Sequence, residues 1–318
     1  MYCIPPTKID QSKVVSGAGF SSIPEPDAAR GEVEWVTGQA VTKDTVRIKA
    51  SLHRKYRAIA DMTAGDNNVS PESAPTKWQD IGATNKYSMY ELNRNSSSKA
   101  ITQIVATVAP GKRINSVFLG GVVGGTVKLE ILDAANTLIV QYDYVLSSRV
   151  GVSSWSQYFF GEFENTPSVF QIGIPPVSGV KIRVTITSFV PGVEVALASF
   201  IVGNAVYMGE IQWQPESDTQ NFSKIERSFD GELQDTNLIR RRNVPQLSLR
   251  LNSPKDITNT LRKLRDDLNA SPAVWTGLDE NIEHPYYESL LIFGIYRQFK
   301  INLKFLDWTE VTLLLEEM

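Results

Sequence analysis

The stretch Val180-Lys-Ile-Arg-Val-Thr-Ile-Thr-Ser188 alternates apolar and polar side chains from Val180 to Thr187. A period of two is typical of a strand that buries one face and exposes the other, as strands of antiparallel sheets do. Residues Thr126–Leu132 repeat this alternation, with Val127, Leu129 and Ile131 separated by charged residues. The two stretches therefore predict that the centre of the chain folds as an antiparallel β-structure.

Further candidate strands surround these two stretches between residues 83 and 209. Gly, Pro and Asn residues separate them at short intervals, which is typical of a jelly-roll β-sandwich. No helix of three turns is predicted in this region. The candidate strands are Ala100–Val108, Ser116–Gly120, Thr126–Leu132, Thr137–Tyr144, Trp155–Phe163, Ser168–Gly173, Val180–Ser188 and Val193–Val202.

Two shorter regions precede the predicted sandwich. Residues 1–34 are rich in Pro, Ser and Gly and keep no period, so we expect an extended arm that becomes ordered on a neighbouring subunit. The alternative is a flexible terminus that does not become ordered on a partner. Residues 35–82 combine short strands with Gly, Asn and Pro turns and predict a small β-module. A unit of this size has little core, so its large aromatic side chains must supply most of the buried surface.

The region 210–318 combines strands with one predicted helix over 254–268. The helix follows the strand Gln246–Asn252, with Ser253 as its N-cap and Pro254 at its first position. We expect a C-terminal β-sandwich or barrel with one α-helix. The apolar stripe of this helix consists of Ile257, Leu261, Leu264 and Leu268. Later strands are predicted at Ala273–Thr276, Ser289–Tyr296, Phe299–Leu306 and Thr309–Leu315.

Composition excludes several classes of protein. The chain has 318 residues, a formal net charge of -3, a single cysteine (Cys3) and two histidines (His53 and His284). One cysteine cannot form an intrachain disulfide, and a zinc site needs three or four ligands, so we expect neither. A chain with a near-neutral net charge is not expected to bind nucleic acid directly. The sequence begins without a signal peptide and contains no membrane-spanning segment, so we expect synthesis and assembly in a reducing cytosol.

Two adjacent carboxylate pairs are the strongest candidates for acid–base chemistry. Asp266 and Asp267 lie on the predicted helix, and Glu316 and Glu317 lie at the C-terminal end. Neither pair has a base or an electrophile donor beside it in the sequence. We therefore expect no catalytic residues and no cofactor.

Three other motifs are interpreted as structural features and not as catalytic or ligand-binding sites. The run Gly120–Gly125 lies between two strands and lacks the helix N-terminus of a phosphate site, so it is predicted to form a flexible hairpin. His53 lies among basic residues and is expected at the surface. The acidic residues Asp279, Glu280 and Glu283 beside His284 are expected in a solvated turn, so no metal site is predicted.

Three aromatic residues mark the small module. Trp35, Tyr56 and Trp78 occur in a pattern in which Pro75 stands three residues before Trp78 and a glycine follows soon after. The pattern resembles the small chitin-binding-type carbohydrate module that recurs in phage tail proteins. The resemblance implies that the three rings stack on sugar rings. The competing interpretation is that they fill a small core.

A second pattern joins this module to the predicted sandwich. The stretch Trp78-Gln-Asp-Ile-Gly-Ala-Thr-Asn-Lys-Tyr87-Ser-Met-Tyr90 is similar to a recurrent phage-tail signature. In phage tail proteins this signature leads into a galactose-binding-like β-sandwich. The resemblance implies the fold more strongly than it implies sugar binding, because one fold supports many functions.

The C-terminal region resembles the core of distal tail and baseplate-hub proteins of tailed phages. The resemblance rests on Arg227-Ser-Phe-Asp-Gly231, Leu247-Ser-Leu249, the leucine-rich helix and Ala273-Val-Trp275, together with the basic run Arg240, Arg241 and Arg242. It implies a ring that continues the tail tube. Those ring-forming proteins usually carry this region at the N-terminus. The arginine run suits a subunit interface. A solvated edge that blocks strand pairing and a wall of the tube lumen are the alternatives.

These observations favour a structural virion protein of a phage tail, in the tail tip, baseplate or collar. We expect it to form or decorate a symmetric ring of identical subunits and to link tube and hub proteins to fibres or receptor-binding parts. We expect it to be located in the virion after assembly in the host cytoplasm. The first alternative is a glycan- or receptor-binding tail protein whose partner is a host surface glycan. The second is a polysaccharide-degrading tail enzyme that uses carboxylates alone.

Overall fold

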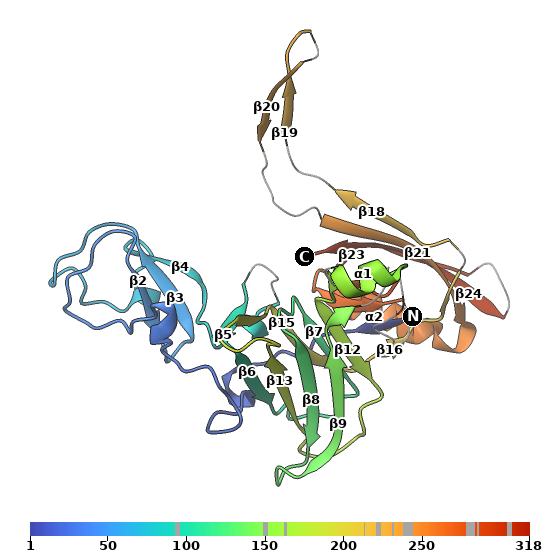
Figure 1. Cartoon of the computed structure of the whole chain (residues 1–318), viewed down its shortest axis with the longest axis horizontal. Helices are drawn as coiled ribbons and strands as arrows, with labels where there is room; N and C mark the ends of the chain where they lie inside the picture. The colour runs from blue at the N-terminus through green and yellow to red at the C-terminus, as the bar shows by residue number, and fades with distance from the viewer. Residues whose placement is uncertain are drawn as a thin grey trace. The chain divides into compact units, whose positions relative to one another are not determined.

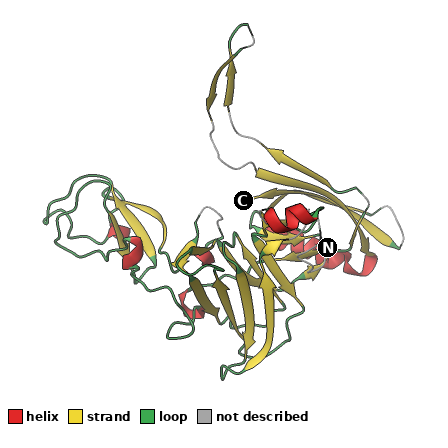
Figure 2. Ribbon diagram, in the orientation of Figure 1, coloured by secondary structure: helices red, strands yellow, loops and turns green. Residues whose placement is uncertain are grey.

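The structure is a computed structural model, and it confirms a mainly β chain (Figure 2). The chain divides into two compact units. The sandwich unit comprises Thr7–Val202, and the terminal unit combines Met1–Pro6 with Gly203–Met318. The small module lies within the sandwich unit. The described residues are 1–92, 96–148, 152–161, 164–212, 214–220, 224–230, 232–237, 244–277, 284, 286–303 and 307–318.

An antiparallel four-stranded sheet forms one layer of the sandwich (Figure 1). Its order is β6 (Gln103–Val108), β13 (Lys181–Thr187), β8 (Thr126–Leu132) and β9 (Leu138–Val145). Ile182, Val184 and Ile186 of β13 are fully buried, whereas the polar residues between them face the other side. The predicted period of two is therefore confirmed in the central strand.

A three-stranded sheet supplies further buried residues to the sandwich. Its order is β12 (Ser168–Ile172), β7 (Ser116–Gly120) and β15 (Ser199–Gly203). All five residues of β7 and of β15 are buried, which is typical of strands in a sandwich core. Two small pairs also belong to the sandwich unit. They are β5 (Ser98–Ile101) with β14 (Glu194–Leu197), and β10 (Ser147–Ser148) with β11 (Glu164–Asn165).

The strand predicted over Trp155–Phe163 is wrong for Trp155–Phe160, which form the helix α1. Residues 162 and 163 lie outside the described residues. The Ser154 hydroxyl accepts a hydrogen bond from the Gln157 backbone N–H at 3.2 Å, and the Gln157 side chain accepts one from the Ser153 N–H at 2.9 Å. A serine followed three residues later by glutamine is a helix-start signal. This local capping outweighed the β-propensity of the aromatic residues.

The glycine-rich run does not form a flexible hairpin, because β7 and β8 belong to different sheets. The run Gly120–Gly125 instead crosses from one sheet to the other through tightly packed space. A Cβ on Gly121 would lie 2.6 Å from the Ala198 Cβ, and one on Gly124 would lie 2.7 Å from Ile186. Glycine is therefore required here by close packing.

The small module is a three-stranded antiparallel sheet. Its strands are β2 (Val46–Lys49), β3 (Arg54–Ala58) and β4 (Trp78–Ala83), with β3 in the middle. A short 3-10 helix, η3 (Pro71–Ser73), precedes β4. The predicted short strands are thus confirmed.

Residues 1–34 are bound to their own chain, which corrects the expectation of an arm ordered by a neighbour. The strand β1 (Tyr2–Ile4) pairs with β22 (Ala273–Thr276) and β16 (Val206–Tyr207) of the terminal unit. Burial raises the pKa of the Cys3 thiol in β1, so this thiol is protonated at neutral pH.

The segment that follows β1 runs beside the edge strand β6. The Val15 N–H donates to the Thr107 carbonyl at 2.9 Å, and the Ser22 N–H donates to the Val105 carbonyl at 3.0 Å. Its two 3-10 helices are η1 (Gln11–Lys13) and η2 (Ala28–Arg30). These intrachain bonds order the segment without a second subunit.

The terminal unit is built on one eight-stranded sheet. Its order is β16-β1-β22-β23-β24-β21-β17, and β18 also pairs with β21. The remaining bounds are β17 (Glu210–Ile211), β18 (Glu216–Gln220), β21 (Val244–Pro254), β23 (Leu291–Asn302) and β24 (Trp308–Glu317). Another 3-10 helix, η6 (Glu288–Leu290), precedes β23. A separate hairpin joins β19 (Lys224–Arg227) to β20 (Leu233–Asn237).

The predicted helix is confirmed, although it begins later than expected. A 3-10 turn, η5 (Lys255–Ile257), leads into α2 (Thr258–Leu268). Ser253 lies in β21 instead of capping the helix, and its hydroxyl donates to the Met208 carbonyl. Leu261, Leu264 and Leu268 of α2 are buried in one cluster with the leucines of β21.

One strand, β23 (Leu291–Asn302), covers most of the two strands predicted over Ser289–Tyr296 and Phe299–Leu306. Residues 304–306 of the second prediction lie outside the described residues. Its pairing with β24 shifts between Tyr296 and Gln298, so the strand accommodates one extra residue as a bulge. The bulge lets the strand continue through the residues that separate the two predicted strands.

Candidate interaction surfaces

Two of the three predicted stacking aromatics fill the core of the small module. Tyr56 is 5% exposed and Trp78 is 2% exposed, and both pack in one cluster with Val41 and Met62. Stacking on a sugar requires an accessible ring face, which these two side chains lack. Their burial supports the core-filling interpretation and removes them from a sugar site.

Trp35 is the remaining member of the predicted trio. Its ring is half-buried against the same cluster, and its Nε1–H donates to Asn67 Oδ1 at 2.8 Å. The Lys49 ammonium lies 4.6 Å from the ring centroid, within cation–π range. The exposed part of Trp35 is therefore already in contact with a cation.

The residues of the phage-tail signature connect the module to the sandwich. Asp80 accepts two hydrogen bonds from Arg54, at 2.9 and 2.8 Å. Gly82 has a φ of 120°, which favours glycine. Further along the signature, Met89 is buried, and the Tyr90 ring lies 5.9 Å from that of Phe200 in the sandwich. Each of these residues has a structural role.

Asn85 is the central residue of this connection. Its amide donates to Asp27 Oδ2 at 2.7 Å and to the Lys99 carbonyl at 2.8 Å, and its Oδ1 accepts from the Lys99 N–H at 2.9 Å. The Asn85 backbone N–H donates to Glu32 Oε1 at 2.6 Å. Asp27, Glu32 and Asn85 are all buried. We call this group, with Lys99, the Asn85 clamp, since it ties the N-terminal segment to β5.

His53 is not the surface residue that the sequence predicts. Its Nδ1 lies 2.7 Å from Glu25 Oε2, and its ring stacks on Tyr87 with centroids 3.7 Å apart. The other Glu25 oxygen accepts a hydrogen bond from the Thr84 hydroxyl at 2.6 Å. The basic neighbours in the sequence gave no sign of this acidic partner, because Glu25 lies 28 residues earlier.

The helix α1 exposes an unusual amount of aromatic surface. Trp155 is 78% exposed, Phe159 is 67% exposed and Phe160 is 88% exposed. The Trp155 and Phe159 rings stack with centroids 6.1 Å apart, and the Tyr158 ring lies edge-on to Phe159 at 5.3 Å. We call Trp155, Tyr158, Phe159 and Phe160 the α1 aromatic surface. Contiguous exposed apolar side chains of this kind mark interaction sites in soluble proteins.

A second exposed aromatic lies in the terminal unit. Phe229 is fully exposed in the turn between β19 and β20, where Ser228 donates its N–H to the Glu232 carbonyl at 2.8 Å. It belongs to the motif that resembles distal tail proteins. A phenylalanine in the turn of a hairpin is available to insert into a partner.

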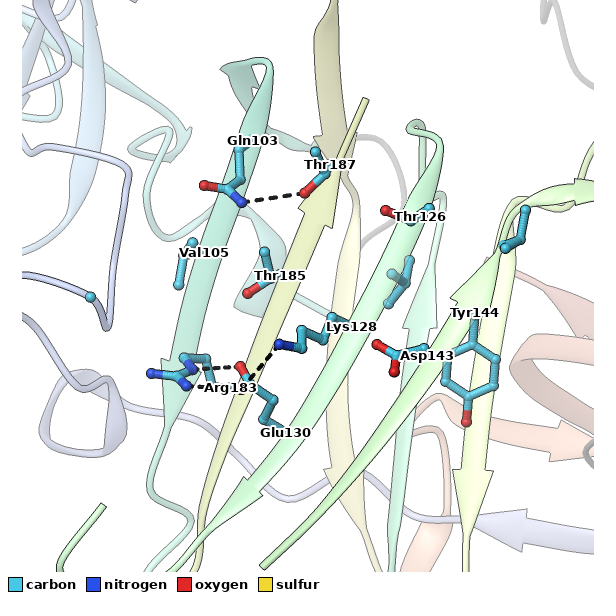
Figure 3. Close-up of a pocket in the computed structure, with 13 residues that line it drawn as sticks. Gln103, Val105, Thr126, Lys128, Glu130, Asp143, Tyr144, Arg183, Thr185 and Thr187 are labelled. Carbon is cyan, nitrogen blue, oxygen red and sulfur yellow. Dashed lines mark hydrogen bonds and ion pairs between the residues drawn. The ribbon is translucent and has the colours of Figure 1, made fainter. Parts of the chain in front are cut away.

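The outer face of the four-stranded sheet carries a groove of about 530 Å³ (Figure 3). Polar side chains of β13 and β8 form its floor, among them Thr185, Lys128 and Thr126. At one end, Arg183 Nε and Nη2 donate to the two oxygens of Glu130 at 2.7 and 3.0 Å.

The ion pair at the end of the groove fixes the charge of Glu130. The hydrogen bonds from Arg183 hold the pKa of the Glu130 carboxyl below its ordinary value. Lys128 contributes a weaker attraction, with its Nζ 3.6 Å from Glu130 Oε1. Glu130 is therefore an anion at neutral pH, although its side chain is buried.

The remaining candidates from the sequence are the carboxylate pairs, the basic run and the acidic residues beside His284. Asp266 is exposed and binds its neighbour Arg265, and Glu316 binds Arg297, which lowers the pKa of the Glu316 carboxyl. Among the described residues, no group of three or more His, Cys, Asp or Glu side chains is arranged to hold a metal ion. The run Arg240, Arg241 and Arg242 and the acidic residues Asp279, Glu280 and Glu283 lie outside the described residues.

Comparisons with protein-family models, with curated proteins and with solved structures find no match for this chain. The resemblances to phage tail proteins therefore rest on the quoted residues alone. Within the described part of the chain, no helix has the length and hydropathy needed to cross a membrane.

Proposed function

We propose that this chain is a structural protein of a phage tail, in the tail tip, baseplate or collar. It assembles with copies of itself in a ring and with other tail proteins. The resemblance of the signature and of the C-terminal region to tail proteins supports the setting. The burial of Asn85 and Met89 and the contact of the Tyr90 ring with Phe200 are consistent with a signature that serves the fold.

The α1 aromatic surface is the observation that carries the proposal. A protein that remains alone in water gains nothing from keeping Trp155, Phe159 and Phe160 exposed, because burial of each ring in an interface is favourable. A symmetric ring repeats one interface many times, so a modest apolar contact is multiplied. We propose that a neighbouring subunit or tail protein covers this surface.

An electron-microscopy map of the assembled tail tests the proposal. It is expected to contain this chain in several symmetry-related copies. The triple substitution Trp155→Ser, Phe159→Ser and Phe160→Ser is expected to abolish incorporation into the tail without lowering the melting temperature. Ile101→Ser changes a residue that is 65% exposed on another part of the sandwich unit, and it serves as the matched control. The proposal fails if the chain is recovered only as a monomer away from tails.

The two alternative functions that the sequence leaves open are glycan binding and polysaccharide degradation. Glycan binding through the aromatic trio loses its support, because Tyr56 and Trp78 are buried. A polysaccharide-degrading activity through the two carboxylate pairs of the sequence also loses support, because Asp266 and Glu316 each bind an arginine. Release of reducing ends from a host surface glycan by the purified chain would revive the enzyme hypothesis.

A further inference from the structure

We infer that the edge strand β9 is an interaction surface on which a second copy of this chain pairs, strand against strand, about a two-fold axis. The two β9 strands run antiparallel, and their pairing joins two four-stranded sheets into one continuous sheet. This inference goes beyond the proposed structural role and does not depend on it, because it concerns a sheet edge and not the α1 aromatic surface.

The two edges of the four-stranded sheet differ in what covers them (Figure 1). The N-terminal segment covers β6 at one edge. There the Val15 N–H donates to the Thr107 carbonyl at 2.9 Å, and the Ala109 N–H donates to the Lys13 carbonyl at 2.7 Å. At the other edge, β9 pairs with β8 and with no other strand in the part of the chain that the structure describes. An uncovered edge presents backbone N–H and C=O groups that a further strand can bind.

The sequence of β9 lacks most of the features that block pairing at an edge. Residues Leu138–Val145 contain no lysine, arginine or proline, and Asp143 is their one charged side chain. Val145 is 58% exposed. The register with β8 accommodates Ile139 as an extra residue near the start of the strand, so residues 140–145 pair regularly. Because lysine, proline and bulges are the usual protection of an edge, most of β9 is open to a partner strand.

The backbone of β9 directs every second residue to the open edge. The Leu146 N–H, directly after β9, donates to the Gly125 carbonyl directly before β8, at 2.9 Å. Hydrogen-bonded and non-hydrogen-bonded pairs alternate along an antiparallel ladder, so the residues of β9 at even spacing from Leu146 bond to β8. Gln141, Asp143 and Val145 therefore direct their N–H and C=O groups away from β8 and toward a partner.

The side chains of β9 select one register and make the strand complementary to itself. A two-fold axis requires one residue to lie opposite its own copy. With Tyr142 at the axis, each Asp143 lies opposite Gln141 of the second copy, and Ile139 lies level with Val145. With Asp143 at the axis, two carboxylates face each other, which is unfavourable. With Gln141 at the axis, Asp143 faces the apolar Ile139.

The register centred on Tyr142 also uses the outward backbone groups. Gln141 of one copy and Asp143 of the other form hydrogen-bonded pairs, and each pair exchanges two N–H···O=C bonds. Within a single chain the Gln141 amide already donates to Asp143 Oδ2 at 2.7 Å, so both side chains lie on one face of β9. A contact of one short strand is smaller than a standard interface, so we expect a dissociation constant on the order of 100 μM.

The test is sedimentation-velocity ultracentrifugation of the purified chain below and above the expected dissociation constant. We expect a monomer–dimer equilibrium. Gln141→Asp sets a carboxylate opposite Asp143 twice in each dimer and should weaken dimerisation about tenfold. Gln141→Lys sets an ammonium group there and should strengthen dimerisation about tenfold. Loss of the fold cannot produce a tighter dimer, so the lysine variant tests the register even if the aspartate variant is unstable.

Gln103→Asp makes the same substitution at an exposed glutamine of the covered edge strand β6, and it is the matched control. It should dimerise as the wild type does. Hydrogen exchange followed by NMR at low and high concentration locates the contact. The amides of Gln141 and Asp143 should exchange more slowly at high concentration, because they become hydrogen-bonded in the dimer.

Three outcomes would overturn the inference. The first is a monomer at every concentration for both the wild type and Gln141→Lys. The second is a dimer in which exchange of the Gln141 and Asp143 amides does not depend on concentration, as for a dimer formed through α1. The third is equal dimerisation of Gln141→Asp and Gln141→Lys. Incorporation into tails is scored separately on the α1 variants, so failure of this inference and failure of the structural role remain distinguishable.

Discussion

The small module and the helix α1 use the same kinds of side chain for opposite purposes. Tyr56 and Trp78 are buried in the module, whereas Trp155, Phe159 and Phe160 are mostly exposed. Tyr56 lies in the central strand β3 and Trp78 in the neighbouring strand β4, and both pack in one core cluster. The exposed residues lie on a helix less than two turns long. The comparison teaches that an aromatic motif indicates where large rings occur and leaves open which rings meet a partner.

Substitution of the buried tryptophan should have the largest effect. Trp78→Ala removes the largest side chain of a small core, so we expect the free energy of unfolding of the module to fall by about 3–5 kcal/mol. Hydrogen–deuterium exchange of residues 35–82 and thermal denaturation measure this loss. Trp155→Ala, the matched control on α1, should change stability by less than about 0.5 kcal/mol. Equal losses in the two variants would contradict the contrast between buried and exposed aromatics.

The Asn85 clamp should show the next largest effect. Asn85→Ala removes three side-chain hydrogen bonds and leaves the buried Asp27 carboxylate with fewer donors. We expect a loss of about 2–3 kcal/mol in urea denaturation, with faster exchange in residues 25–32. Asn68→Ala, where the amide makes one exposed hydrogen bond to Gly65, is the control and should be nearly neutral. An N-terminal segment that stays protected in Asn85→Ala would refute the role of the clamp.

The Arg183–Glu130 pair should have a smaller, pH-dependent effect. Because folding lowers the pKa of Glu130, its contribution to stability is present above the ordinary glutamate pKa. The contribution is lost as the pH falls through the lowered, folded-state pKa. Arg183→Met should therefore cost about 1 kcal/mol at neutral pH and flatten the acid side of the stability curve. Lys128→Met, which removes the weaker 3.6 Å contact, should flatten it less.

Much of the fold could be predicted from local patterns. The alternation of Val180–Ser188 and the leucine stripe of α2 are set by burial of one face, which a sequence displays directly. The bulge in β23 and the crossing of the glycine run between sheets depend on pairing partners far away in the chain. No local pattern carries that information.

The candidate surfaces were harder to predict than the fold. Trp35, Tyr56 and Trp78 stood out because of their motif, although a small module needs such rings for its own core. The aromatic run of α1 predicts a strand, and only the spacing of Ser154 and Gln157 indicates a helix. The groove combines residues from β6, β13, β8 and β9, so no single stretch of sequence contains it.

Hydroxyl-radical footprinting of the free chain and of the assembled tail tests the central claim most directly. Mass spectrometry of both samples measures the labelling of each aromatic residue. We predict that Trp155, Phe159 and Phe160 are labelled in the free chain and protected in the tail, while Trp78 stays unlabelled in both. Equal labelling of the α1 aromatic surface in the two samples would contradict the account.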